Sequence, residues 1–212
     1  MVDHVPTAFA ALVAEAAPRT LALSGGDTAR ACYERLAVAD VEWGDVTVVF
    51  GDERWVPVDD PDSNEGMARR ELLDRVEPRA VHSMRAAGDT PEAAAEAYDA
   101  LLRAIGPISV VHLGLGSDGH TASLFPGSSA LGERDLLAVA SGDDAHPFPR
   151  VTLTFPAIGA AELVVFTVTG VEKRAAFARV RAHDDVPAAR VAARRVIWLV
   201  DPVAAGRAPT TL

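Results

Sequence analysis

Short apolar segments alternate with longer amphipathic segments along most of this chain, and this alternation restricts the fold more than any other feature. It predicts a Rossmann-like α/β fold, in which a mainly parallel sheet carries helices on both faces. The near-continuous hydrophobicity of the short segments is typical of strands that are buried on both faces. The expected strands are 21–23, 46–50, 108–113, 151–154, 163–169 and 196–200, and the expected helices are 7–17, 28–39, 64–76, 91–105 and 172–182.

Length and composition are those of a soluble globular chain. A domain commonly has about 150 residues, so the 212 residues are expected to form one domain over 1–212. Hydrophobic residues make up 49% and charged residues 24%, which argues against disorder. No apolar run approaches the roughly 20 residues that span a bilayer. No Lys or Arg precedes Arg19, so the pattern of a signal peptide is missing and a cytoplasmic location is expected.

Charge and cysteine content narrow the range of partners. Twenty basic residues against 30 acidic ones give a net charge of −10, without any basic tract. Nucleic acid and membrane are therefore not expected partners, since phosphate-backbone binding needs clustered Lys and Arg. An anionic ligand would require a local positive pocket against the adverse overall field. The single cysteine, Cys32, excludes an intrachain disulfide and is expected to be a buried structural thiol.

A pair of glycines follows the first expected strand. Residues 21–28 read LALSGGDT, so the chain passes through Ser24, Gly25 and Gly26 into a helix that begins near Thr28. Glycine lets the backbone approach a ligand closely, and a helix N-terminus offers unpaired N–H groups and a partial positive charge. The turn therefore suits a phosphate group, although tight strand-to-helix turns need glycine for their geometry alone.

Three consecutive charged residues, Asp52, Glu53 and Arg54, follow the expected strand at 46–50. In open α/β sheets, ligands bind at this carboxyl end of the strands. The guanidinium of Arg54 suits a phosphate or a carboxylate, and Asp52 suits a ligand hydroxyl. A salt-bridged turn is the alternative that these residues leave open.

The segment 114–127, GLGSDGHTASLFPG, has the clearest chemical character. Histidine is the side chain most easily tuned as a base near neutral pH, and Asp118 can fix the tautomer and orientation of His120. His112 lies inside the preceding strand and is expected to be a core residue. Ser117 lacks the first glycine of a nucleophile elbow, and a third metal ligand is not evident, so neither a serine hydrolase nor a metal site is expected.

A fourth strand end passes through Gly170 into a helix that carries Lys173, the only lysine beside 19 arginines. Either a compact ammonium is needed there, or the lysine was retained by chance. Four glycine-bearing strand ends with Arg, His and Lys at one sheet edge predict a site for a small anion. The loops 59–63 and 141–149 are long enough to shape it.

Five segments together resemble the 6-phosphogluconolactonase family of the glucosamine-6-phosphate isomerase/deaminase-like superfamily. They are LSGGDT at 23–28, DERWVPVDDPDSN at 52–64, LGLGSDGHTASLFPG at 113–127, RVTLTFPAI at 150–158 and GVEKRAAF at 170–177. They occur in the family's order and span most of the chain, and the second and third are long enough to be specific. The resemblance implies an α/β fold of the NagB/RpiA/CoA-transferase-like type.

The resemblance implies hydrolysis of 6-phospho-D-glucono-1,5-lactone to 6-phosphogluconate in the oxidative pentose phosphate pathway, without a metal or an organic cofactor. The implied partner is a small sugar-phosphate lactone, and we expect a monomer or a weak homodimer. His120 is implied as the general base, with Asp118 and Asp52 in its polar surroundings. The residues implied to bind substrate are Ser24, Gly25, Gly26, Thr28, Arg54, Lys173 and Arg150.

Two alternatives accompany this interpretation. The related deaminases carry a glutamate five residues after the histidine, where this chain has Phe125, and usually a tyrosine in place of Arg54. A non-catalytic sugar-phosphate sensor would need a DNA-binding segment, which the sequence does not show. Asp27 departs from the family's Ser or Thr, and a carboxylate there would repel a phosphate by about 1 kcal/mol unless it caps the helix and points away.

Overall fold

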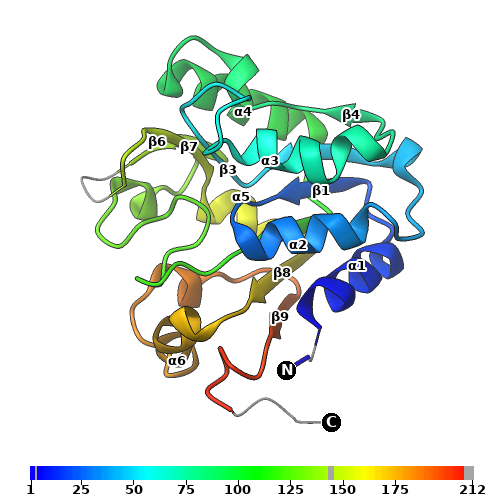
Figure 1. The fold of residues 1–212 in the computed structure, drawn as a ribbon. Helices are drawn as coiled ribbons and strands as arrows, with labels where there is room; N and C mark the ends of the chain where they lie inside the picture. The colour runs from blue at the N-terminus through cyan, green and yellow to red at the C-terminus, as the bar shows by residue number, and fades with distance from the viewer. Residues whose placement is uncertain (3, 143–145, 208–212) are drawn as a thin grey trace.

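The computed structural model describes residues 1–2, 4–142 and 146–207, which form a six-stranded parallel sheet and a smaller antiparallel sheet (Figure 1). The strand order of the large sheet is β4-β2-β1-β5-β8-β9, and all its pairs are parallel. Its strands are β1 (Thr20–Leu23), β2 (Thr47–Phe50), β4 (Ala80–Val81), β5 (Val110–Leu113), β8 (Leu163–Val168) and β9 (Val196–Val200). The α/β fold predicted from the alternating pattern is confirmed.

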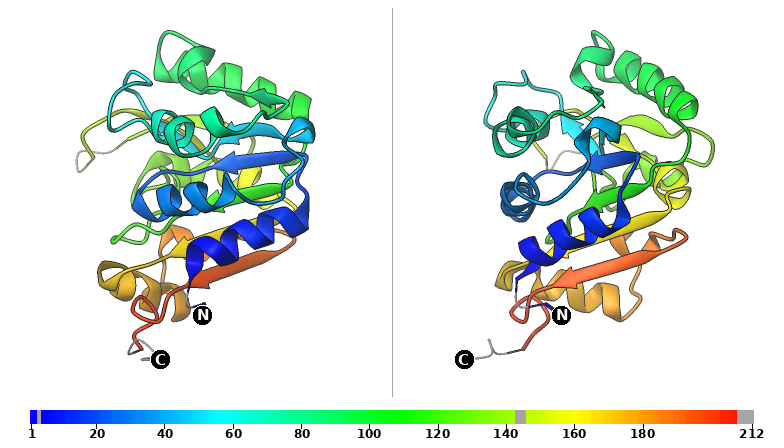
Figure 2. Two further views of the ribbon diagram at one scale, coloured as in Figure 1. Left: turned by 45° about the vertical axis from the view of Figure 1, so that its right-hand side comes forward. Right: turned by 90° about the vertical axis from the view of Figure 1, so that its right-hand side faces the viewer.

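Helices cover both faces of the large sheet, as predicted. In Figure 2, α1, α2 and α3 lie on one side of the strands, and α4 and α5 lie on the other. The bounds are α1 (Val5–Ala16), α2 (Asp27–Leu36), α3 (Asn64–Glu71), α4 (Pro91–Ile105), α5 (Phe155–Gly159) and α6 (Arg174–Arg181). Short 3-10 turns occur at Trp43–Asp45, Leu73–Arg75, Arg85–Ala87, Ser129–Gly132, Val171–Lys173 and Pro187–Arg190.

The central strands form the core of the molecule. All residues of β1, β5 and β8 are buried, because helices pack on both faces of these strands. This explains why their sequences are continuously apolar and do not alternate. Cys32 lies in the same core, where burial raises the pKa of its thiol to about 12, as expected for a structural cysteine.

The small sheet corrects one expectation about the strands. Residues 151–154 were expected to follow the pattern of the parallel strands, but β7 (Arg150–Leu153) instead lies antiparallel between β3 (Asp52–Arg54) and β6 (Ala138–Ser141). The charged segment after β2, for which a salt-bridged turn was the open alternative, is the strand β3. Strand β7 alternates polar and apolar residues. This pattern predicts a strand, but it does not show whether the strand joins a parallel or an antiparallel sheet.

Three expected helices are shorter than their sequence pattern, and the one expected at 28–39 ends at Leu36. The helix expected at 64–76 ends at Glu71, because Leu72 leaves the helical region and a 3-10 turn follows. The helix expected at 172–182 starts with a 3-10 turn before α6. Of the two long loops, 141–149 falls partly outside the described residues, which omit 143–145. Within the described part of the chain, none of the helices has the length and apolar character needed to cross a membrane.

Candidate active site

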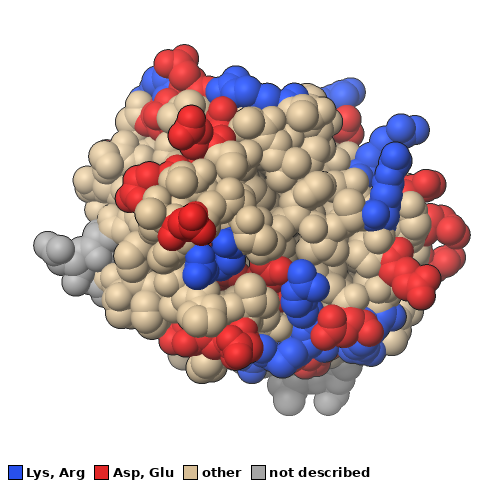
Figure 3. Space-filling model, turned by 90° about the horizontal axis from the view of Figure 1, so that it is seen from above, with Lys and Arg blue, Asp and Glu red and all other residues tan. Residues whose placement is uncertain are grey.

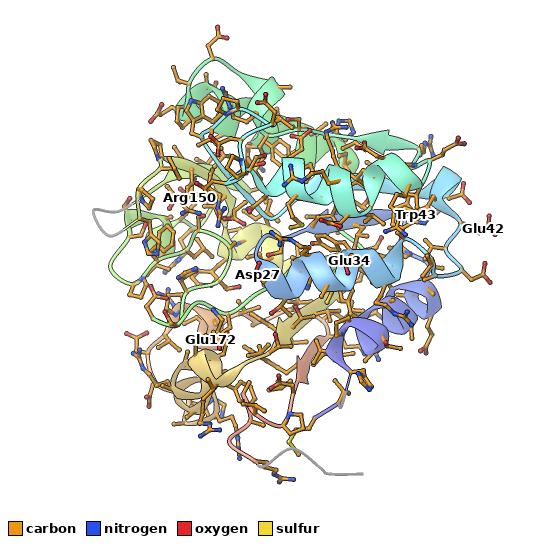
Figure 4. All side chains as sticks on the ribbon, viewed as in Figure 1. Asp27, Glu34, Glu42, Trp43, Arg150 and Glu172 are labelled. Atoms are coloured by element: carbon orange, nitrogen blue, oxygen red, sulfur yellow. The ribbon has the colours of Figure 1, made fainter. Side chains whose placement is uncertain are left out.

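A cavity of about 260 Å³ opens at the carboxyl edge of the large sheet, and all four predicted strand ends contribute to it. The glycine turn provides Ser24, Gly25 and Gly26, the charged strand β3 provides Asp52 and Arg54, the turn after β5 provides Gly114–Ser117 and His120, and the turn after β8 provides Lys173. Arg150, Asn64 and Ala122 complete the lining. Figure 4 shows Asp27 and Arg150 at this end of the molecule, whereas Glu42 and Trp43 lie beyond the other end of α2.

The glycine turn owes its shape to the absence of side chains. Gly26 precedes α2 with a φ of +93°, a conformation that favours glycine. A Cβ on Gly25 would lie 1.8 Å from Oδ1 of Asn64, so only glycine fits beside that amide. One of the residues implied to bind substrate, Thr28, does not face the cavity. The hydroxyl of Thr28 pairs with that of Thr169 at 2.6 Å, and Thr28 does not line the cavity.

Asp27 occupies the first turn of α2 without capping the helix. The N-cap position is Gly26, and Asp27 is the first residue inside the helix, which corrects the capping alternative. The side chain is 96% exposed and lies 3.7 Å from the guanidinium of Arg30. Asp27 is not part of the cavity lining. The carboxylate therefore points away from the cavity, and its repulsion of an anion there is screened by solvent.

His120 and Asp118 form a hydrogen-bonded pair at the turn after β5. Nδ1 of His120 lies 2.6 Å from Oδ1 of Asp118, and the backbone N–H of His120 donates to the same oxygen. Glycine makes room for the ring, since a Cβ on Gly116 would lie 2.2 Å from Nδ1. Burial lowers the pKa of His120, and the carboxylate of Asp118 partly opposes this shift. Burial acts to raise the pKa of Asp118, but its hydrogen bonds and charge interaction with His120 outweigh burial and lower that pKa. The imidazole is thus neutral near pH 7 and oriented to accept a proton at Nε2.

Two cationic side chains reach the cavity from the paired strands β3 and β7, where Arg54 is opposite Arg150. Arg54 is held by a hydrogen bond from Nη1 to the carbonyl of Asp62 at 2.5 Å. Its Nε is buried and makes no hydrogen bond to any described residue. The guanidinium of Arg150 lies over the ring of Phe125 and 3.9 Å from Oδ2 of Asp52. Both arginines were predicted to bind substrate.

Lys173 approaches from the neighbouring strand β8. The chain turns at Gly170, with a φ of +95°, and the N–H of Gly170 donates to the carboxylate of Asp201. The 3-10 turn that follows places the partly buried Lys173 in the cavity wall. The lone lysine therefore joins the other cations, as the sequence predicted.

His112 is a core residue, as expected. It is fully buried, its Nδ1 lies 2.9 Å from the hydroxyl of Tyr33, and its Nε2 lies 2.8 Å from the hydroxyl of Thr167. Burial lowers the pKa of His112 to about 3, so the ring is neutral. Because His112 is buried inside the strand and does not line the cavity, it cannot contact a ligand there.

Sequence reasoning missed Asn64 and His146. Asn64 begins α3 and lines the cavity, and its Nδ2 donates to the carboxylate of Asp52 at 3.2 Å. The sequence signal that could have pointed to Asn64 was its place as the last residue of the family-like segment 52–64. The ring of His146 stacks on Phe125 at 4.0 Å and lies 5.4 Å from that of His120.

Three of these side chains also have the chemistry of metal ligands. Asp118, His120 and His146 offer ligand atoms that all lie within 4.8 Å of one another, so a divalent ion could be held there. The hydrogen bond between Asp118 and His120 already uses one atom of each. This hydrogen bond explains why Asp118 and His120 lie together, and it does not require an ion.

Comparisons with known proteins point to one family. The profile of the family described as glucosamine-6-phosphate isomerases/6-phosphogluconolactonase matches residues 1–198. A 6-phosphogluconolactonase of Nostoc sp. strain PCC 7120 is 40% identical over 200 residues, which are 87% of this chain and 82% of the relative. The solved structure of 6-phosphogluconolactonase from Trypanosoma brucei is 30% identical, with a TM-score of 0.83 and coverage of 97% of each chain. A monomeric glucosamine-6-phosphate deaminase shares the fold, with a TM-score of 0.81 at 19% identity and coverage of 96% of this chain and 95% of that one.

Proposed function

Because the chain belongs to the family of glucosamine-6-phosphate isomerases and 6-phosphogluconolactonases, we propose that it hydrolyses 6-phospho-D-glucono-1,5-lactone to 6-phospho-D-gluconate. The observation that carries this proposal is the pairing of His120 with Asp118 in a cavity that also holds Arg54 and Lys173. A neutral base and two cations meet in one small space. This combination suits a substrate that has a phosphate at one end and an electrophilic carbonyl at the other.

The phosphate is anchored by the cations and the glycine turn. Arg54 offers its guanidinium, Lys173 offers an ammonium, and the turn at Gly25 and Gly26 leads into the N-terminus of α2. Charge-assisted hydrogen bonds of this kind are about twice as strong as neutral ones. They offset the overall charge of −10, which otherwise disfavours an anion. On the face shown in Figure 3, the described Lys and Arg side chains occur in small groups between acidic ones.

Hydrolysis then needs a water molecule directed at C1 and a base for its proton. Nε2 of His120 takes the proton as the water oxygen bonds to C1, and Asp118 stabilises the imidazolium that forms through Nδ1. The carbonyl electrons move to the oxygen, and the ring C–O bond breaks as the tetrahedral intermediate collapses. The leaving oxygen takes up a proton, and the base is regenerated. This route uses no metal, no organic cofactor and no covalent nucleophile.

Phe125 distinguishes this chemistry from that of a deaminase. Its ring is fully buried and lies 4.9 Å from that of His120, at the position where the deaminases carry a glutamate. An apolar ring beside the base excludes water from positions other than the attacking one. A carboxylate at this position would instead repel the anionic substrate. The apolar neighbour therefore favours lactone hydrolysis over deamination.

The test measures both reactions on purified protein. Fresh 6-phosphogluconolactone is expected to give rapid proton release above the spontaneous rate, and glucosamine 6-phosphate is expected to give no ammonia. Phe125→Glu serves as the comparison, and we expect it to weaken lactone turnover without creating a deaminase. Ammonia from the wild-type protein at a rate that rivals lactone hydrolysis would overturn the proposal.

The wider setting follows from this reaction. We propose that the chain acts in the oxidative pentose phosphate pathway, in the cytoplasm, as one domain over residues 1–212. A monomer or weak homodimer is sufficient, since the four strand ends that line the cavity all come from one chain. Its partner is the sugar-phosphate lactone, without nucleic acid or membrane.

A further inference from the structure

Ser123 lies three residues after His120 but is hidden from the cavity. Its side chain is fully buried and is absent from the lining. Its hydroxyl donates to Oδ2 of Asp52 at 2.6 Å, and Asp52 does line the cavity. Ser123 therefore stands behind the carboxylate and cannot touch a ligand itself.

Ser123 is held from several directions. Its backbone N–H donates to the hydroxyl of Thr152 in β7 at 3.1 Å, and its carbonyl accepts from the hydroxyl of Ser141 in β6 at 2.6 Å. The residue before it, Ala122, has a φ of +48°, which is unfavourable for any residue except glycine. This turn of the backbone lets His120 face the cavity while Ser123 faces the protein. The small antiparallel sheet thus fixes the hydroxyl in place.

The other oxygen of Asp52 is also occupied. Nδ2 of Asn64 lies 3.2 Å from Oδ1, and the backbone N–H of Asn64 is itself fixed by the carboxylate of Glu53. The guanidinium of Arg150 forms an ion pair with Oδ2 at 3.9 Å, which is longer than a hydrogen bond. Two neutral donors therefore satisfy a carboxylate that is only 5% exposed. These two donors are neutral and orient the carboxylate, whereas Arg150, which forms an ion pair with it at 3.9 Å, is the cation that faces its charge.

We infer that Ser123 is a positioning residue for the reaction, which acts by holding the carboxylate of Asp52 toward the cavity. In that orientation Asp52 is a second negative charge, beside Asp118, that stabilises the protonated imidazole of His120. Burial lowers the pKa of His120, and the negative charge of Asp52, which lines the same cavity, acts in the opposite direction. This inference rests on the proposed lactone hydrolysis, in which His120 becomes protonated.

A double-mutant cycle tests the inference. We expect Ser123→Ala to lower kcat by about tenfold with a smaller change in KM, because the carboxylate loses its charge-assisted bond. In the background of Asp52→Asn, the same substitution is expected to have no further effect on kcat. Ser141→Ala is the matched control, since it removes a bond to the Ser123 carbonyl and leaves the bond to Asp52. Losses from Ser123→Ala and Asp52→Asn that multiply in the double variant would overturn the inference.

A second pair of measurements separates positioning from packing. Ser123→Cys preserves the buried volume but donates weakly, so we expect its thermal unfolding to stay near that of the wild type while kcat falls as in Ser123→Ala. Wild-type kcat in Ser123→Cys would contradict the role of the hydroxyl. All assays are run at a temperature where each variant is folded.

The titration of His120, followed by NMR, does not depend on turnover. Asp52→Asn is expected to lower the pKa of His120, and Ser123→Ala is expected to lower it as well. In the double variant the pKa of His120 is expected to equal that in Asp52→Asn alone. A shift in Asp52→Asn with none in Ser123→Ala would overturn the inference. A wild-type protein that fails to hydrolyse the lactone, yet shows these shifts, would instead count against the proposed function alone.

Discussion

The strand β5 and the turn that follows it each carry a histidine, eight residues apart, and the two are put to different uses. His112 lies inside the strand between the hydroxyls of Tyr33 and Thr167, where the ring is fully buried. His120 lies past the end of the strand, its side chain is 25% exposed, and it is paired with the carboxylate of Asp118. Burial lowers the pKa of both rings, but only His120 has a charged partner and access to the cavity.

The difference shows that position along the strand decides function in this fold. Residues inside a parallel strand are covered by helices on both faces, so they contribute to stability. Residues just past its carboxyl end are exposed at the edge where ligands bind. The neighbouring strand β8 repeats the arrangement, with Thr167 buried in the strand and Lys173 in the cavity wall. Substitutions inside the strands should therefore change stability, and those beyond the ends should change catalysis.

The largest effect is expected from His120→Ala. The loss of the base should lower kcat by about 10²–10⁴-fold, while the free energy of unfolding changes little because the residue lies in a turn. Proton release and urea unfolding measure the two quantities. His4→Ala, at an exposed histidine that makes no capping bond, is the control and should change neither. Near wild-type turnover in His120→Ala would refute the assignment of the base.

His112→Ala should show the opposite pattern. The variant loses core packing and the hydrogen bonds that His112 makes with the hydroxyls of Tyr33 and Thr167, so we expect the free energy of unfolding to fall by about 2–4 kcal/mol. The value of kcat per folded molecule should be largely retained. Urea unfolding and an active-fraction assay test this. A large fall in kcat at unchanged stability would contradict the division between strand and turn.

Acid should destabilise the protein through His112. The folded pKa is about 3, and an unfolded histidine has a pKa of about 6.5, so the unfolded chain binds a proton that the folded chain does not. Stability is therefore fully present above about pH 6.5 and falls below it, by up to about 1.4 kcal/mol per pH unit from this group. Urea unfolding of the wild type and of His112→Gln between pH 7.5 and 5 isolates the contribution. Parallel pH dependences in the two proteins would contradict it.

Lys173→Ala extends the comparison to β8. A phosphate remote from C1 contributes mainly to ground-state binding, so we expect KM to rise by about tenfold and kcat to fall less. Lys173→Arg should rescue KM only in part, because the guanidinium is longer and planar. Steady-state kinetics on the lactone measure both constants. Unchanged kinetics in Lys173→Ala would mean that the lysine has no role in binding.

The smallest effect concerns the pH dependence of the rate. Burial lowers the pKa of His120, so the acid limb of kcat/KM is expected below the ordinary histidine value of about 6.5. Asp118→Asn removes the negative charge that raises the pKa of His120. The acid limb of kcat/KM should therefore move to still lower pH, and the maximal value of kcat/KM should fall. A limb that moves to higher pH in Asp118→Asn would show that the carboxylate does not support the protonated ring.

The sequence by itself determined the fold class and the edge of the sheet at which the site lies. Apolar runs such as 163–169 predict buried parallel strands because their hydrophobicity reflects burial on both faces, which is a local property of the segment. The glycine turns predict the strand ends for a similar reason, since close backbone approach and a positive φ at Gly26 and Gly170 require glycine. His112 was likewise assigned to the core from its place inside a strand.

Tertiary structure alone decided which side chains face one another across the cavity. The pairing of β3 with β7 brings Arg150 beside Arg54, and the contact of Asn64 with Asp52 joins the start of one helix to a strand twelve residues earlier. The bond from Ser123 to Asp52 spans 71 residues. Each of these contacts depends on the packing of separate elements in three dimensions, and the hydrophobic pattern of a single segment contains no information about the partner it will meet.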